Sequence, residues 1–268
     1  MSGATLQPLA SMPPGVRAGI RGVLTDIDDT LSTHGRLTAD AYMALERLRE
    51  AGLLVVPITG RPAGWCDHIA RMWPVDAVVG ENGAFYMRYD APTRRLLKRF
   101  VDDAAIRRAH RERLAAIADR IVVAVPGCAP ASDQLYRETD LAIDFCEDVP
   151  PLPRADVDRI VALLEAEGLT AKVSSIHVNA WFGRYDKLGM TRTLLAEAFG
   201  VDVDAERERW LFVGDSPNDA PMFAYFPHAV GVANVRGFAD RIATLPAYVT
   251  TAEGGAGFAE LANWLLAR

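Results

Sequence analysis

Short apolar runs alternate with segments of helical period along most of this 268-residue chain. Such alternation predicts a parallel β-sheet whose strands are joined by crossover helices. The run from Leu53 to Ile58 is apolar without alternation, as expected of a strand covered on both faces. The fold class that follows is α/β, with a Rossmann-like parallel-sheet core and helices on both faces. Strands are expected at Gly22 to Thr25, Leu53 to Ile58, Asp76 to Val79, Trp210 to Val213 and Ala229 to Val232.

Helix boundaries in this core follow from residues that stop helices. Gly52 ends a helix that begins near Ala39, and Gly200 ends one that begins at Lys187. Pro74 limits a short helix around Trp65 to Met72. Two further helices are expected, one ending near Tyr225 and one running from about Gly257 to Leu266.

The strand and helix rhythm breaks between residues 85 and 186, which predicts an inserted α+β domain. The catalytic core would then comprise residues 21–84 and 187–268, and residues 1–20 would form a flexible N-terminal tail. Within the insertion we expect helices at about Ala104 to Ile121 and Arg154 to Gly168, and strands at Leu141 to Cys146 and Lys172 to Trp181.

Composition limits the partners and the compartment. The chain has 29 Lys and Arg against 35 Asp and Glu, a formal charge of -6, which argues against a broad nucleic-acid surface. No apolar run is long enough to span a bilayer, so no membrane partner is expected. Three cysteines form no disulfide framework, and a reducing, cytoplasmic location fits best. We expect a small-molecule partner and a monomer or homodimer.

The first polar segment at a strand end is Asp26-Ile27-Asp28-Asp29-Thr30. Residues two apart at a strand end point to the same side, so Asp26 and Asp28 can face one reacting centre while Ile27 faces the core. An EF-hand calcium loop is excluded, because it would need Gly at position 31 and Glu at position 37, and both are Leu. A helix cap with surplus acid remains as the structural alternative.

Two further segments could hold phosphate oxygens. Thr59-Gly60-Arg61 offers a hydroxyl and free backbone amides after the second strand, although Thr-Gly is also ordinary turn chemistry. Lys187 begins a helix after Tyr185-Asp186. Taken alone, a single lysine is more often a solvated surface charge.

The fourth segment, Gly214-Asp215-Ser216-Pro217-Asn218-Asp219, follows the apolar run that ends at Val213. Two carboxylates and an amide in one turn suit a hard divalent cation. An Asx turn that caps the next helix is the structural alternative. In open α/β sheets ligands bind outside the carboxyl ends of the strands, so all four segments should converge there.

The order and spacing of these segments resemble the four motifs of the haloacid dehalogenase superfamily. The resemblance also includes Glu81-Asn82-Gly83-Ala84, which precedes the insertion. An insertion between the second and third motifs resembles the type IIB cap of Cof-like, sucrose-phosphate and mannosyl-3-phosphoglycerate phosphatases. The resemblance implies a phosphoric monoester hydrolase that depends on Mg²⁺ and places substrate specificity in the cap.

The resemblance also implies roles for individual residues. Asp26 would be the nucleophile that forms an aspartyl-phosphate, and Asp28 would be the general acid and base. Mg²⁺ would be held by Asp26, the backbone carbonyl of Asp28 and Asp215, with Asp219 ligating through water or orienting Lys187. The phosphoryl oxygens would be bound by Thr59, Gly60, Lys187 and Asn218.

One departure and two rival functions remain. Asp29 stands where many relatives carry Gly, which leaves the fine geometry of the first turn open. A phosphomutase would use the same aspartyl-phosphate but return the group to a bound sugar. A non-catalytic sugar-phosphate-binding regulator would keep the fold but lose the nucleophile or the acid, and this chain has both.

The cap offers one clue to the substrate. Alternation along Val173 to Trp181 places Ser175, His177 and Asn179 on one face, which could line the cleft or form a solvated sheet face. Hydroxyl, imidazole and amide groups there would suit a sugar or polyol phosphate. The remaining candidates are interpreted as structural or surface residues: Cys66, Cys128, Cys146, His34, His68, His110 and His228.

Overall fold

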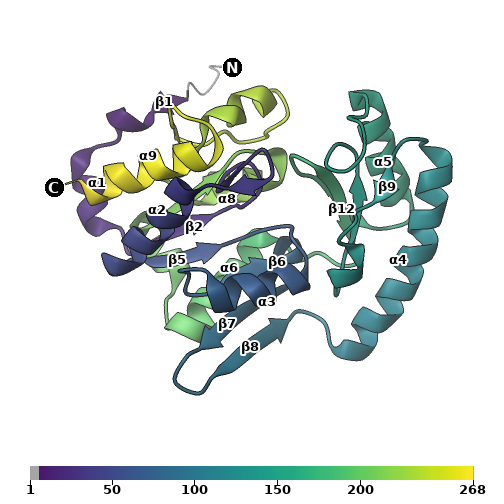
Figure 1. The fold of residues 1–268 in the computed structure, drawn as a ribbon, viewed down its shortest axis with the longest axis horizontal. Helices are drawn as coiled ribbons and strands as arrows, with labels where there is room; N and C mark the ends of the chain where they lie inside the picture. The colour runs from purple at the N-terminus through teal and green to yellow at the C-terminus, as the bar shows by residue number, and fades with distance from the viewer. Residues whose placement is uncertain (1–5, 268) are drawn as a thin grey trace.

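The computed structural model describes residues 6–267 as a parallel-sheet core with a smaller antiparallel domain beside it (Figure 1). The core sheet has six strands, and every pair of neighbours is parallel. The predicted α/β fold class is therefore confirmed. In spatial order the strands are β1 (Gln7–Pro8), β15 (Tyr248–Val249), β14 (Val230–Gly231), β13 (Trp210–Gly214), β2 (Gly22–Thr25) and β5 (Leu54–Pro57).

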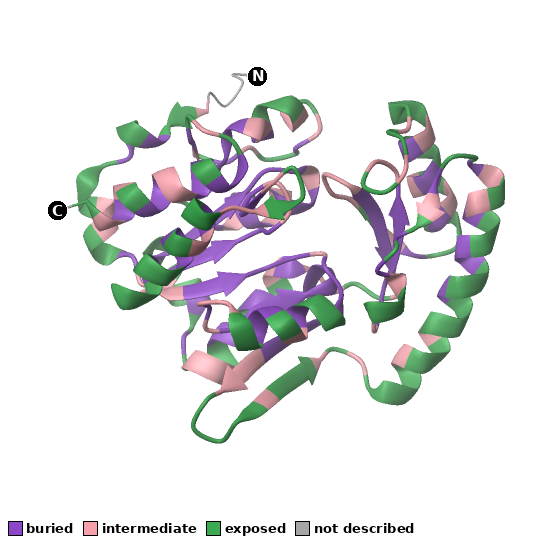
Figure 2. Cartoon of the chain, in the orientation of Figure 1, coloured by how far each residue is buried: buried purple, intermediate pink, exposed green. Residues whose placement is uncertain are grey.

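Helices cover both faces of this sheet, because each central strand buries side chains on both sides. Val23 and Val55 pack beneath α2 (Ala39–Glu50), α3 (Ala63–Met72) and α9 (Gly254–Leu266). The next residues along these strands, Leu24 and Val56, pack against α6 (Lys187–Phe199) and α8 (Ala220–Tyr225). Figure 2 shows the central strands fully buried and the outer helix faces exposed.

The expected flexible tail is wrong for residues 6–20. Strand β1 pairs with β15, and α1 (Pro14–Gly19) follows it. Leu9 and Met12 are buried in the core, because the edge of the sheet offers them apolar cover. The rest of the predicted tail, residues 1–5, lies outside the described residues.

The predicted start of the insertion at residue 85 is also wrong. Strands β6 (Val78–Gly80), β7 (Phe85–Asp90) and β8 (Arg95–Phe100) form an antiparallel sheet, and Val79 makes a parallel bridge to Ile58 beside β5. Phe85 is fully buried in the core cluster, so this hairpin belongs to the core. The insertion, called the cap below, therefore begins after Phe100.

The cap is a four-stranded antiparallel sheet covered on one face by two helices. The helices are α4 (Ala104–Ala124) and α5 (Arg154–Ala166), and Val178 and Ala180 pack against them. Residues that alternate with these, including His177 and Asn179, lie on the opposite face. The strand order is β11 (Thr170–Val173), β12 (His177–Trp181), β10 (Leu141–Asp144) and β9 (Ala129–Pro130).

A single strand from Lys172 to Trp181 was expected, and the structure has a hairpin instead. Val173 pairs with Val178, and residues 174–176 form the turn. The Ser174 hydroxyl oxygen accepts from the backbone N–H groups of Ile176 and His177, which stabilises that turn. Ser175 therefore lies in the turn and not in a strand.

Short elements complete the chain. None of the helices within residues 6–267 is long and apolar enough to cross a bilayer. The remaining elements are β3 (Ser32–Thr33), β4 (Arg36–Leu37), α7 (Val203–Glu206) and the 3₁₀ helices η1 (Leu9–Ser11), η2 (Glu81–Gly83), η3 (Gln134–Tyr136), η4 (Arg207–Arg209), η5 (Pro217–Asp219) and η6 (Ala233–Phe238).

Candidate active site

The carboxyl ends of neighbouring strands bring the first and fourth polar segments together. Asp26 follows β2 and Asp215 follows β13, and these two strands pair in register through Thr25 and Val213. Asp26, Asp215 and Asp219 each offer an oxygen within 4.8 Å of the others, and all three residues are buried. Lys187, at the first turn of α6, contributes the only cation within hydrogen-bonding distance of Asp26 that the described residues show.

Lys187 connects the two ends of this carboxylate cluster. Its Nζ donates to Asp26 Oδ1 and to Asp219 Oδ1, both at 2.7 Å. Burial raises the pKa of Asp26 to about 8, although Lys187 opposes that rise. Burial and the neighbouring Asp26 also raise the pKa of Asp215 well above its usual range. One ammonium group therefore does not balance three buried carboxylates.

The donors and charge of this cluster fit a hard divalent cation. Carboxylate oxygens are the ligands that Mg²⁺ prefers, and a buried excess of negative charge favours a cation there. Asp219 is the least free of the three: its Oδ2 accepts from the backbone N–H of Asp215 (3.0 Å) and of Ser216 (3.3 Å). A Cβ at Gly214 would come within 2.4 Å of Asp219 Oδ2, so this packing requires glycine.

Two residues that received no role from the sequence hold Asp215 in place. Thr30 donates to Asp215 Oδ1 at 3.1 Å, and Asn234 donates to Oδ2 at 3.0 Å. Asn234 also donates to the carbonyl of Asp29 at 3.0 Å. Thr30 was visible as the end of the first motif, whereas no sequence signal distinguished Asn234, which lies in the 3₁₀ helix η6.

Asp28 lies apart from the carboxylate cluster and faces Arg61. The Arg61 Nε donates to both carboxylate oxygens of Asp28, at 2.9 and 3.1 Å. Asp29 is the next residue along the chain, and its backbone φ is 54°. This left-handed conformation is one that Gly adopts freely and Asp tolerates, so the first turn accommodates Asp29.

The expected phosphate-binding residues lie at the same edge of the sheet. Thr59 is fully buried and its hydroxyl oxygen accepts from the backbone N–H of Arg61 at 3.0 Å. Asn218 Oδ1 accepts from the Ser216 hydroxyl at 2.8 Å. A Cβ at Gly60 would be only 3.1 Å from Asn82 Nδ2, so the backbone there is closely approached.

Asn82, in the segment Glu81-Asn82-Gly83-Ala84, is a polar group to which the sequence assigned no role. It is 2% exposed, and neither its amide nitrogen nor its oxygen has a partner among the described residues. It lines a cavity of about 260 Å³ together with Lys187 and Asn218. An unpaired buried amide beside Gly60 is therefore available to a bound ligand.

Of the three cap residues predicted from alternation, Asn179 and Ser175 contact the core, whereas His177 contacts another cap residue. Asn179 donates to Asp140 Oδ2 at 3.3 Å and lies against Gly60. His177 Nε2 is 2.9 Å from Glu147 Oε2. Ser175, in the turn, lies beside Asp29.

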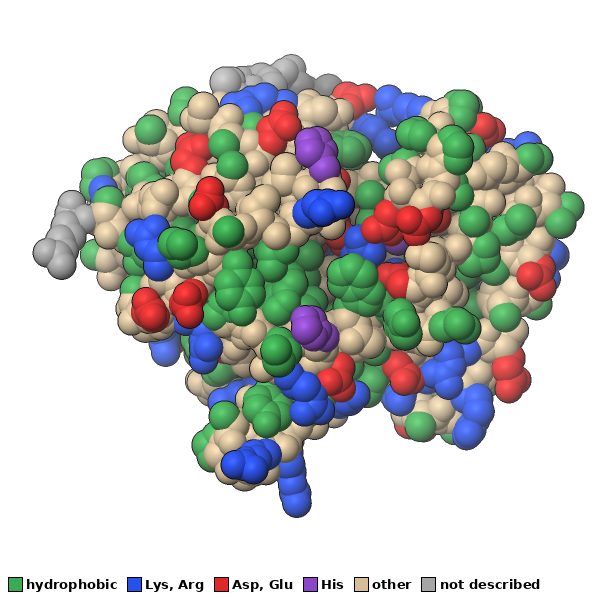
Figure 3. Space-filling view, viewed as in Figure 1, with side chains coloured by type: hydrophobic (Ala, Val, Ile, Leu, Met, Phe, Trp, Pro, Cys, Tyr) green, Lys and Arg blue, Asp and Glu red, His purple; other side chains and the backbone are tan. Residues whose placement is uncertain are grey.

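A buried polar boundary joins the cap to the core. Glu81, in η2, accepts from the backbone N–H groups of Glu138 (2.9 Å), Thr139 (2.7 Å) and Asp140 (3.3 Å), as well as from Ala63 (2.9 Å). Figure 3 shows acidic and basic side chains along the front of this boundary.

Arg137, from the cap, crosses the same boundary. It donates to the carbonyl of Gly60 and to Asp140, both at 2.9 Å. No sequence signal predicted the contact with Gly60, because the two residues lie 77 positions apart along the chain.

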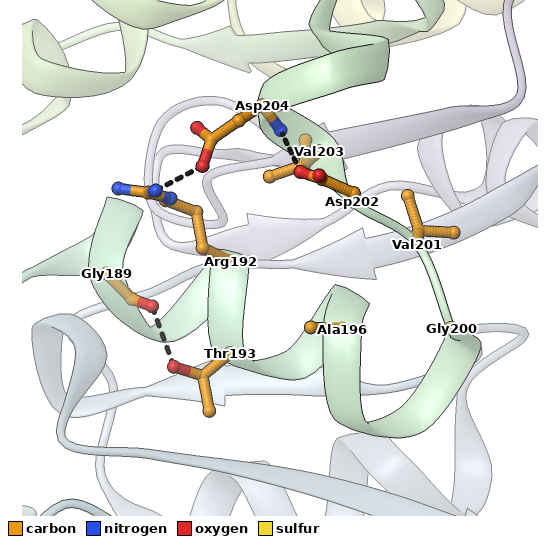
Figure 4. Close-up of a pocket in the computed structure, with 9 residues that line it drawn as sticks. All are labelled: Gly189, Arg192, Thr193, Ala196, Gly200, Val201, Asp202, Val203 and Asp204. Atoms are coloured by element: carbon orange, nitrogen blue, oxygen red, sulfur yellow. Dashed lines mark hydrogen bonds and ion pairs between the residues drawn. The ribbon is translucent and has the colours of Figure 1, made fainter.

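A larger cavity lies elsewhere. A hollow of about 680 Å³ between α6 and α7 is lined by residues such as Arg192, Thr193 and Asp204 (Figure 4). Arg192 is already paired with Asp204, and none of the lining residues belongs to the carboxylate cluster. The smaller cavity beside Lys187 is therefore the one adjacent to the reactive groups.

Comparison with known proteins agrees with this geometry. Residues 23–112 match the family of haloacid dehalogenase-like hydrolases. The chain is 28% identical to the phosphoglycolate phosphatase of Pyrobaculum neutrophilum over 252 residues, which cover 92% of this chain and 96% of that protein.

Solved structures show the same fold. The Thermoplasma acidophilum 0175 protein has a TM-score of 0.65 and 20% identity, covering 92% of this chain and 98% of that one. The sucrose-phosphatase of Synechocystis has a TM-score of 0.62 and 16% identity, covering 92% and 98%. The predicted resemblance to the haloacid dehalogenase superfamily with a type IIB cap is confirmed.

Proposed function

We propose that this chain, a phosphatase of the haloacid dehalogenase superfamily, hydrolyses a small phosphate ester through an aspartyl-phosphate on Asp26. The observation that carries the proposal is the contact of one buried lysine, Lys187, with two of three clustered carboxylates. A buried nucleophile held beside a cation and two further acids has the parts that phosphoryl transfer requires. Asp26, Asp215 and the backbone carbonyl of Asp28 would hold Mg²⁺, which offsets charge on the transferring group when bound.

The proposed chemistry has two steps. In the first, an Asp26 carboxylate oxygen attacks phosphorus, the ester P–O bond breaks, and Asp28 gives its proton to the leaving oxygen. In the second, Asp28 takes a proton from water, which attacks the aspartyl-phosphate and releases inorganic phosphate. Lys187, Thr59, Gly60 and Asn218 would bind the phosphoryl oxygens in both steps, and Asp219 would orient Lys187.

Two classes of substrate fit the cavity and the cap. A sugar or polyol phosphate suits the polar cap face of Ser175, His177 and Asn179. A phosphorylated hydroxy acid is favoured by the name of the Pyrobaculum relative and by two cations, Lys172 and Arg184, that line the cavity beside Lys187. These cations would attract a carboxylate on the substrate.

A panel of phosphate esters separates the two classes. The panel contains 2-phosphoglycolate, glycerol phosphates and hexose phosphates, each assayed for phosphate release with Mg²⁺. A preference for 2-phosphoglycolate that disappears in Lys172→Ala supports the hydroxy-acid class. Unchanged Michaelis constants across the sugar phosphates in Asn179→Ala would remove the proposed contact of the cap with the substrate.

Asp26→Asn tests the mechanism itself. We expect Mg²⁺-dependent hydrolysis of p-nitrophenyl phosphate to fall at least about 10⁴-fold, because the covalent intermediate cannot form. Asp67→Asn is the matched control, since Asp67 is a partly exposed carboxylate that pairs with Arg71 away from the cluster. Retained activity in Asp26→Asn would end the proposal.

A phosphomutase remains the alternative within the same chemistry. It would transfer the phosphoryl group from the aspartyl-phosphate to a bound sugar and release little inorganic phosphate. Measuring free phosphate and isomerised sugar phosphate in the same reaction distinguishes the two outcomes.

A further inference from the structure

Arg61 is the side chain that joins the proposed general acid to the cap. Its guanidinium lies 2.8 Å from Asp28 through Nη2 and 2.6 Å from Glu147 of the cap through the same nitrogen. Nη1 lies 3.4 Å from a second cap carboxylate, Asp133. Arg61 is only 4% exposed, so its guanidinium is largely shielded from water.

Core residues hold both the backbone and the guanidinium of Arg61. The backbone N–H of Arg61 donates to the Thr59 hydroxyl oxygen, and its guanidinium lies over the ring of Trp65 at 4.6 Å. Its Nε donates to both carboxylate oxygens of Asp28. A guanidinium donates in a planar fork, so a fixed plane also fixes the orientation of the carboxylate it binds.

The cap side depends on domain closure. Glu147 follows β10, and its backbone N–H donates to Asp144 Oδ1 at 2.8 Å. Its carboxylate accepts from Arg61 on one side and contacts His177 at 2.9 Å on the other. Of these contacts, only the one between Arg61 and Glu147 joins the cap to the core, so it alone requires the cap to lie against the core.

We propose that Arg61 is a positioning residue that orients Asp28 for proton transfer, and that Glu147 makes this orientation depend on cap closure. The inference rests on the proposed role of Asp28 as general acid and base. Arg61 itself neither gains nor loses a proton. Its part is to hold the Asp28 carboxyl group where the leaving oxygen and, later, the attacking water must lie.

Leaving-group dependence tests this role. A p-nitrophenolate leaves without a proton, whereas an alkoxide requires one. The probes are p-nitrophenyl phosphate and the alkyl phosphate that the panel above shows to be hydrolysed best. The parameter is kcat/KM, because it reports the first step, in which Asp26 is phosphorylated.

In Arg61→Gln we expect kcat/KM for the alkyl phosphate to fall about 10- to 100-fold, and kcat/KM for p-nitrophenyl phosphate to fall less than about threefold. Arg61→Lys keeps the charge but loses the fork, so it should restore only part of the loss. A burst of p-nitrophenol before steady state is also expected in Arg61→Gln, because Asp28 serves the second step too.

Glu147→Gln keeps the test usable if Arg61→Gln does not fold, since it leaves the Arg61 contact with Asp28 intact. We expect the same selective loss on the alkyl phosphate, at about threefold. Arg154→Ala is the matched control: Arg154 also pairs the cap with the core, at 3.0 Å to Asp240, but is exposed and far from the acid. It should leave both substrates unchanged.

Equal losses on both substrates, or no loss on either, would overturn the positioning role. Failure of this inference can be distinguished from failure of the proposed function. If Asp26→Asn is inactive while the Arg61 and Glu147 variants keep the wild-type ratio of the two substrates, only the present inference falls. If Asp26→Asn remains active, the proposed function falls with it.

Discussion

The carboxylate cluster of the core and the cap boundary are both buried and charged, but their carboxylates have different partners. In the cluster, Lys187 faces three acids, and the pKa of Asp26 rises to about 8. At the boundary, the buried Arg61 and Arg137 are each paired with carboxylates.

This difference indicates what each region is built to do. In the cluster, the raised pKa values of Asp26 and Asp215 indicate that one ammonium group does not balance the three carboxylates, so a bound cation would stabilise their charged forms and the cluster is suited to receive a metal. At the boundary, the buried Arg61 of the core pairs directly with carboxylates of the cap, so this region is suited to hold the two domains in one arrangement. Substitutions should therefore affect ligand-dependent properties in the first region and ligand-independent stability in the second.

After Asp26→Asn, the largest effect is expected from Asp215→Asn. Hydrolysis of p-nitrophenyl phosphate with Mg²⁺ should fall at least about 10³-fold, because a proposed metal ligand is lost. The free energy of unfolding without metal should change by no more than about 1 kcal/mol, because relief of repulsion in the cluster offsets a weakened bond from Asn234. Steady-state kinetics and urea unfolding measure the two quantities.

Metal addition sharpens this contrast. Mg²⁺ should raise the melting temperature of the wild-type protein and leave that of Asp215→Asn unchanged, since only an intact site couples binding to folding. An equal rise in both proteins would show that the cluster is not where the cation binds.

Glu81→Gln should give the largest effect on stability at the boundary. Glu81 accepts from three backbone N–H groups of the cap. Glutamine replaces one of the accepting oxygens with an NH₂ group, which would face these N–H donors and could not accept from them. The free energy of unfolding should fall by about 3 kcal/mol with or without Mg²⁺.

Glu138→Gln is the control for Glu81. Its side chain is 41% exposed and pairs with Arg111 on the surface, so its replacement should cost less than about 0.5 kcal/mol. A loss in Glu81→Gln that Mg²⁺ reverses would contradict the division into a ligand-dependent and a ligand-independent region.

The two regions also differ in how far the sequence predicted them. The core site could be predicted because Asp26, Thr59 and Asp215 each follow an apolar strand, and parallel strands end at one edge of the sheet. Lys187 has no such signal of its own, and only its place in the ordered set of motifs pointed to it.

The boundary could not be predicted in the same way. Its contacts join Glu81 to Thr139 and Arg61 to Glu147, and charged residues in the loops of an insertion have the pattern of a solvated surface. Arg61 was noticed as part of Thr59-Gly60-Arg61, yet its partners lie 33 and 86 residues away along the chain. Alternation placed His177 and Asn179 on one face, but it missed the turn that contains Ser175.

The smallest effect is expected from the acid titration of Glu147. Burial alone would raise its pKa, but contacts with His177 and Arg61 outweigh burial and lower the pKa from 4.5 to about 2. The unfolded chain therefore binds more protons than the folded protein below about pH 4.5. The stability that Glu147 contributes is present above that pH and is lost as the pH falls towards 2.

Glu147→Gln removes this titration. Because the Glu147 side chain is 26% exposed and partly screened, the difference in unfolding free energy between wild type and variant should shrink by only about 1 kcal/mol from pH 6 to pH 3. Urea unfolding at the two pH values measures it, with Glu138→Gln as the exposed control. A difference that stays constant would mean that the Arg61 and Glu147 pair does not form in solution, and the cap boundary would then lack the direct pairing of cap and core charges that distinguishes it from the cluster.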